Sequence, residues 1–135
     1  MLGLLDRFRK KKDKEKINNE TAPTITELEQ LCGGDKETYD ALVHAMFLDP
    51  RKIEISIKDA VKEAGQFEKA KDLVRARAMY EVAGGLAIYE GDLDEVVEFF
   101  SKCEELLSDR KYPILKNPEK AIAVAQEYYK KYLNA

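Results

Sequence analysis

The side chains that most often perform chemistry in proteins are few in this chain, and their spacing matches no catalytic motif. His44 is the single histidine, and a lone histidine needs a partnered nucleophile or acid to act as a general base. The three serines lie outside any GxSxG setting, and the phosphate-binding patterns GxxxxGK[ST] and GxGxxG are absent. Neighbouring acids such as Glu104 and Glu105 point to different faces of a helix. The sequence therefore predicts a protein that is not an enzyme.

Metal and cofactor sites are not predicted either. Cys32 and Cys103 are far apart, and no CxxC pair suggests a zinc site or a redox centre. A di-iron bundle needs Glu-x-x-His on two helices, which one histidine cannot supply. We expect no cofactor, no metal, and two free thiols that are buried or half-buried.

Charge is distributed unevenly along the 135 residues. Residues 1–16 carry seven basic and three acidic side chains, a net charge of +4, so the rest of this −3 chain carries −7. In this basic arm the apolar residues precede the positive charge, which is the reverse of a secretory signal. We therefore expect a cytoplasmic protein. The densest part of the arm consists of Arg7, Arg9, Lys10, Lys11 and Lys12.

Three interpretations of the basic arm remain open. It could be a solvated tail, or a first helix docked on the domain. It could bind an anionic membrane surface, because Leu4, Leu5 and Phe8 stand beside the basic cluster. It could instead contact nucleic-acid phosphates without sequence specificity. The near-neutral total excludes a uniformly basic nucleic-acid binder, and no apolar run approaches the roughly 20 residues that cross a bilayer.

Helical periodicity dominates the chain after a polar linker that ends at Pro23. Apolar residues recur every three or four positions, and no segment sustains an alternation of period two. The expected segments run from a cap at Thr26 to Gly33, and then over residues 36–48, 50–65, 67–90, 93–107 and 118–133. The sequence predicts an all-α fold of five to six helices in antiparallel hairpins. We divide it into an arm and linker, residues 1–23, and one helical domain, residues 24–135.

The centre of the predicted core is the stretch from Ala78 to Tyr89, where Glu81 is the single charged residue. A helix that is apolar nearly all round is a buried helix. Gly84 and Gly85 would each cost about 1 kcal/mol in a helix interior. Either a neighbouring helix approaches closely at this pair, or the helix breaks there.

Two of the helix pairs carry a family resemblance. Residues 65–70 have the pattern Gly-x-Phe-x-x-Ala, and residues 91–96 repeat the spacing as Gly-x-Leu-x-x-Val. This pattern resembles the interhelical turn of the tetratricopeptide repeat, over about residues 51–108. The two glycines are 91 − 65 = 26 residues apart, whereas the family repeats every 34 residues. One helix would serve both units, or one unit is truncated. Similar patterns occur in three-helix domains of the MIT type.

The resemblance implies a protein-binding groove lined by the first helix of each pair, and hence an adaptor or interaction module. The corresponding positions are Lys52, Ile55, Asp59, Lys62 and Glu63 in the first unit, and Ala78, Glu81, Gly85, Ile88 and Tyr89 in the second. Glu81 and Gly85 stand where clamps for a peptide carboxylate have Lys and Asn, so such a clamp is not expected. Glu81 would favour a basic partner, or it lies on the wet edge of a buried helix.

Self-association is the main alternative to a separate protein or peptide partner. Two repeat units leave apolar flanks exposed unless another element covers them. The last helix is the candidate cap. If it docks elsewhere, its tyrosines 128, 129 and 132 form a candidate dimer interface.

Overall fold

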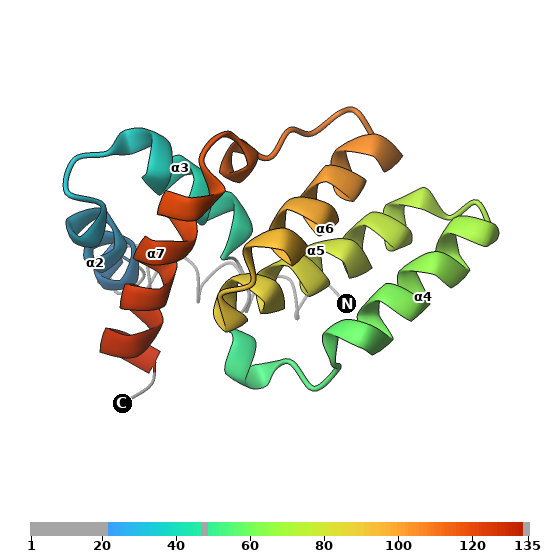
Figure 1. The fold of residues 1–135 in the computed structure, drawn as a ribbon, viewed down its shortest axis with the longest axis horizontal. Coiled ribbons are helices and arrows are strands. Elements are labelled where there is room, and N and C mark those ends of the chain that lie inside the picture. The colour runs from blue at the N-terminus through green and yellow to red at the C-terminus, as the bar shows by residue number, and fades with distance from the viewer. Residues whose placement is uncertain (1–21, 47–48, 134–135) are drawn as a thin grey trace, which may run out of the picture. The chain divides into compact units, whose positions relative to one another are not determined.

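The computed structural model describes residues 22–46 and 49–133, and this part of the chain is helical throughout apart from short connections. Six α-helices and three shorter helical turns make up these residues, which contain no strand (Figure 1). The predicted all-α fold is confirmed. The basic arm, Phe47 and Leu48 lie outside the described residues. The chain divides into two compact units, residues 1–34 and 35–135, and each is described by itself.

In the first unit, α2 (Ala22–Cys32) begins earlier than the sequence predicts. Thr26 lies inside the helix and is therefore not its N-cap. The predicted boundary between residues 23 and 24 also falls within α2. Gly33 and Gly34 end the helix as expected, and Leu28 and Cys32 are buried.

The second unit opens with α3 (Lys36–Ala45), which begins at the predicted residue. The preceding Asp35 caps it, because its carboxylate accepts a hydrogen bond from the Thr38 amide at 3.1 Å. The next predicted helix, from Pro50 to Gly65, is wrong at both ends. Pro50–Lys52 form only a short 3₁₀ turn, η1, and α4 (Ile57–Lys69) starts after it. Ser56 separates the two, because its hydroxyl caps α4 by accepting the Asp59 amide at 3.1 Å.

The predicted helix from Phe67 to Glu90 is two helices in the structure. The chain turns at Ala70–Asp72, and α5 (Leu73–Glu90) begins there, capped by Asp72. Within α5 the pair Gly84–Gly85 does not break the helix. A Cβ atom on Gly84 would lie 2.6 Å from the Phe100 ring, so the next helix approaches closely at this point. The close-approach interpretation is confirmed.

The remaining elements follow the predicted order. Helix α6 (Leu93–Leu106) begins at the predicted residue and is capped by Asp92, and α7 (Pro118–Tyr128) begins at position 118 as predicted. The segment predicted as a loop between them contains the 3₁₀ turn η2 (Pro113–Lys116), and Tyr112 and Ile114 are buried there. A π-helical turn, η3 (Tyr129–Leu133), follows α7.

The α4–α5 and α5–α6 turns have the same construction. Lys71 and Gly91 both take a left-handed conformation, with φ of 65° and 75°. In each turn the next residue, Asp72 or Asp92, caps the following helix and donates its amide back into the preceding one. Position 71 is therefore the structural equivalent of position 91. Gly65, which the sequence pattern pairs with Gly91, lies inside α4 and not in the turn.

Helix α5 is the shared partner of the second unit, because both α4 and α6 pack along it (Figure 1). One helix thus serves both hairpins. Helix α7 packs against α3, α5 and α6, which is the position expected of a cap. The Gln126 side-chain amide in α7 donates to the carbonyls of Ile88 and Tyr89 at 2.7 and 2.8 Å. Tyr128 and Tyr129 are buried, so they are not a free interface.

Candidate interaction surfaces

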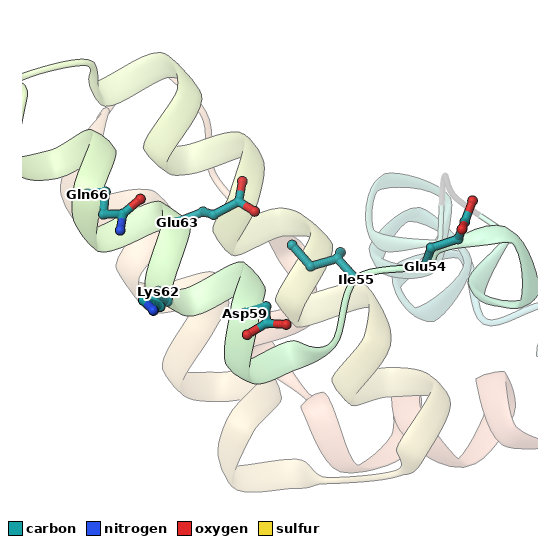
Figure 2. A pocket seen from close by; sticks show the side chains of 6 residues that line it. All are labelled: Glu54, Ile55, Asp59, Lys62, Glu63 and Gln66. Carbon is teal, nitrogen blue, oxygen red and sulfur yellow. The ribbon is translucent and has the colours of Figure 1, made fainter.

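An open groove runs along the exposed face of α4, with a volume of about 560 Å³. Four of the predicted groove residues, Ile55, Asp59, Lys62 and Glu63, line it together (Figure 2). The remaining lining residues are Glu54 and Gln66. We call this set of six residues the α4 groove. Lys52 is exposed in η1 but does not line it.

The helical period explains why these residues lie together. Positions 59, 62, 63 and 66 follow the spacing of three to four residues that defines one face of α4, whereas Ile55 lies in the bend that precedes this helix. Ile55 is half-buried, whereas the other residues of the α4 groove are exposed, and Figure 2 shows Ile55 and Glu63 directed toward α5. The result is one apolar contact point surrounded by charged and amide side chains. Such a surface can bind another chain.

The positions predicted for the second unit do not form a groove. Ala78 is exposed, and Gly85 and Tyr89 are half-buried, but Glu81 and Ile88 are buried. Ile88 is completely covered and the Glu81 carboxylate is occupied by side chains of its own chain, so the assignment of Glu81 and Ile88 as groove residues is wrong.

Glu81 has its basic partner within its own chain. Its Oε2 atom accepts a hydrogen bond from Arg110 Nη1 at 2.8 Å and a short one from the Tyr112 hydroxyl. The Glu81 side chain is 11% exposed and that of Arg110 is 50% exposed, so the pair reaches from the interior to the solvent. We call Glu81, Cys103, Arg110 and Tyr112 the Glu81 cluster. The Glu81 cluster stands where the sequence predicts a solvent-exposed edge of α5.

The Glu81 cluster fixes the α6–α7 connection onto the helices beneath it. The Tyr112 amide donates to Glu104 Oε2 at 2.8 Å, and Tyr112 packs against Phe100 with ring centroids 5.2 Å apart. Burial and the neighbouring Glu81 carboxylate raise the pKa of Cys103 to about 12. A thiol with so high a pKa is neutral and unreactive at pH 7. The Glu81 cluster is therefore suited to holding the fold together.

A second concavity lies between the beginnings of α4 and α6, with a volume of about 580 Å³. Its apolar lining consists of Ile57, Val61 and Phe99, and its charged lining of Lys58, Glu90, Glu95 and Glu98, with Ser56 at the start of α4. We call it the α4–α6 hollow. Both helices pack on α5. Farther along, Lys102 Nζ of α6 and Glu68 Oε2 of α4 form an ion pair at 3.3 Å.

Carboxylates are crowded in the α4–α6 hollow. The pKa of Glu95 is raised, first by burial and then by the negative charges of Asp92 and Glu90. Within residues 22–46 and 49–133, neither Glu90, Glu95 nor Glu98 forms an ion pair with a lysine or arginine. The hollow thus combines an apolar floor with uncompensated negative charge.

Sequence reasoning found the parts of these sites but not their combination. Helical spacing in the sequence puts Ile57 and Val61 on the apolar face of one helix, and Glu95 and Glu98 on the acidic face of another. No sequence signal placed the two faces side by side. The burial of Tyr112 is not predicted because this residue stands directly before Pro113 in an apparent loop, although the apolar run at residues 112–115 could have indicated burial.

His44 is exposed, and its Nδ1 atom lies 2.8 Å from the Asp40 carbonyl oxygen. In the described part of the chain, no three His, Cys, Asp or Glu side chains are arranged to hold a metal ion. No helix among these residues is long and apolar enough to cross a membrane.

Comparison with protein-family models, with curated proteins and with solved structures finds no match. The likeness to tetratricopeptide repeats therefore rests on the sequence pattern alone.

Proposed function

We propose that this protein is a non-catalytic interaction module that binds a segment of another protein along the α4 groove. The observation that carries the proposal is that Ile55, Asp59 and Lys62, all expected to line a groove, meet in one open groove. A half-buried apolar residue within a polar rim is the usual anatomy of a protein interface.

The dimensions of α4 limit the kind of partner. Its 13 residues correspond to about 20 Å of helix, which suits a peptide segment better than a large domain surface. Such a small contact favours a transient complex over a permanent one. We place the module in the cytoplasm, a compartment that fits a chain with two single, widely spaced cysteines and no CxxC pair.

Site-specific photo-crosslinking in the full chain tests this function. A benzoylphenylalanine at position 62 lies in the α4 groove, and one at the exposed position 116 in η2 is the matched control. We expect a discrete crosslinked protein from position 62 in native extract, absent from position 116 and diminished by Ile55→Asp. Equal products from both positions would contradict the proposal, and a product of twice the chain mass would indicate self-association.

A further inference from the structure

The α4–α6 hollow differs from the α4 groove in its chemistry and plays no part in the function proposed above. We propose that the hollow binds a basic amphipathic segment of a partner protein. An apolar side chain of that segment covers Ile57, Val61 and Phe99, and its flanking lysines or arginines pair with Glu90, Glu95 and Glu98.

The floor of the hollow is apolar and fixed in place. Phe99 is 4% exposed and stacks on Tyr80, with ring centroids 6.4 Å apart, so its ring cannot easily move into the hollow. Tyr80 is itself held by a hydrogen bond of 2.8 Å to Glu68. Ile57 and Val61 are half-buried on the opposite wall. A preformed apolar floor lowers the cost of ordering a site when a partner binds.

The net charge of the hollow indicates that the partner segment is basic. Three glutamates and one lysine, Lys58, line it, which leaves a net charge of −2. Elsewhere the chain supplies a cation to a carboxylate of another segment, as Lys102 does for Glu68 and Arg110 does for Glu81. In the hollow the glutamates crowd one another instead. Lysine or arginine side chains from a partner would complement this charge.

The same charge argues against other classes of partner at this surface. Nucleic-acid phosphates and anionic lipid headgroups would be repelled by Glu90, Glu95 and Glu98. The carboxylates also form no group of three that could hold a metal ion, within the residues that the structure describes. A cationic segment with an apolar anchor is the ligand that both the floor and the rim can satisfy.

A synthetic peptide tests the inference without knowledge of the natural partner. The probe is a fluorescein-labelled 14-residue peptide of Leu and Lys with leucines at helical spacing, and the matched peptide has Glu in place of Lys. We expect fluorescence anisotropy to show that the full chain binds the Lys peptide, more weakly as salt is added, and does not bind the Glu peptide. Failure to bind the Lys peptide would overturn the proposal.

Charge-matched variants show where the probe binds. The hollow variant combines Glu90→Gln, Glu95→Gln and Glu98→Gln, and the control combines Glu105→Gln, Glu119→Gln and Glu127→Gln, which remove the same charge from exposed positions elsewhere. We expect the hollow variant to bind the Lys peptide about tenfold more weakly, because three exposed ion pairs together contribute about that much affinity. The control should bind it less than threefold more weakly. Equal losses would mean that the peptide follows net charge alone.

Two further measurements separate this inference from the α4 groove and from self-association. Ile55→Asp should leave Lys-peptide binding unchanged, because Ile55 does not line the hollow. Amide NMR shifts caused by the peptide should centre on Ile57, Val61 and Phe99, and shifts centred on the α4 groove would contradict the proposal. A dimer in light scattering that the hollow variant abolishes would assign the hollow to a second copy and overturn it.

Discussion

Two regions beside α6 place carboxylates in opposite surroundings. In the Glu81 cluster the carboxylate is buried, and the chain provides both a guanidinium and a phenol hydroxyl for it. In the α4–α6 hollow Glu95 is half-buried beside other acids, and no described lysine or arginine forms an ion pair with it. The first arrangement contributes to the stability of the fold. The second costs stability at neutral pH and leaves charge available to another molecule.

The difference indicates where a binding surface lies in this chain. A buried polar group that has all its partners needs no explanation beyond the fold. A crowded group without partners is tolerated at some cost, and a ligand that supplies the missing charge would remove that cost. Glutamate substitutions in the two regions should therefore have opposite effects on stability.

The largest effect is expected from Glu81→Ala, at about 3 kcal/mol of lost stability. The substitution leaves the buried Tyr112 hydroxyl without its acceptor and removes the partner of Arg110. Urea unfolding followed by circular dichroism measures this change. Glu98→Ala in the hollow is the control, and it should stay within about 0.5 kcal/mol of the unsubstituted chain. Similar losses of stability in both variants would contradict the difference proposed between the two regions.

The next effect tests how tightly α5 and α6 pack beside the Glu81 cluster. Gly84→Ala should destabilise the protein by about 2 kcal/mol, because the new methyl group would lie 2.6 Å from the buried Phe100 ring. Gly85→Ala is the matched control, since its nearest neighbour is the Ala45 carbonyl oxygen at 3.7 Å. It should stabilise the protein by up to about 1 kcal/mol through helix propensity. Thermal unfolding of both variants measures these changes. A Gly85→Ala variant that is less stable than the Gly84→Ala variant would contradict the prediction.

The smallest effect concerns Glu95 and depends on pH. Because its pKa is raised in the folded state, its ionised form opposes folding at pH 7, whereas below its unfolded pKa it is protonated in both states. Glu95→Gln should therefore raise stability by a few tenths of a kcal/mol at pH 7, with the gain fading as the pH falls and absent near pH 3. Thermal melts at both pH values measure it. A loss at pH 7 would show that Glu95 has a stabilising partner.

Much of the helical layout could be predicted because its signals are local. Asp35, Asp92 and Pro118 mark helix starts by chemistry that acts within one turn, and these starts are confirmed. The α4–α5 turn was missed because a lysine occupies the left-handed position that glycine usually fills. Lys71 carries no recognisable sequence signal for a helix end.

The sites were less predictable because they depend on contacts between distant segments. Glu81 and Tyr112 are 31 residues apart, and only the fold places the phenol over the carboxylate. The hollow likewise needs the start of α4 and the start of α6 to lie on one side of α5. Helical periodicity identifies the inner and outer faces of each helix, but it does not say which faces become neighbours.

The two equivalent turns, at Lys71 and Gly91, also determine the electric field within the hollow. Two reversals of direction make α4 and α6 run parallel, so both amino-terminal ends flank the hollow. Each end carries a partial positive charge of roughly half an elementary unit from its aligned peptide dipoles. These fields partly offset the carboxylates without forming ion pairs with them, and burial and mutual repulsion still raise the pKa of Glu95. The two helix ends thus lower the cost of the negative charge here, although no described lysine or arginine forms an ion pair with Glu90, Glu95 or Glu98.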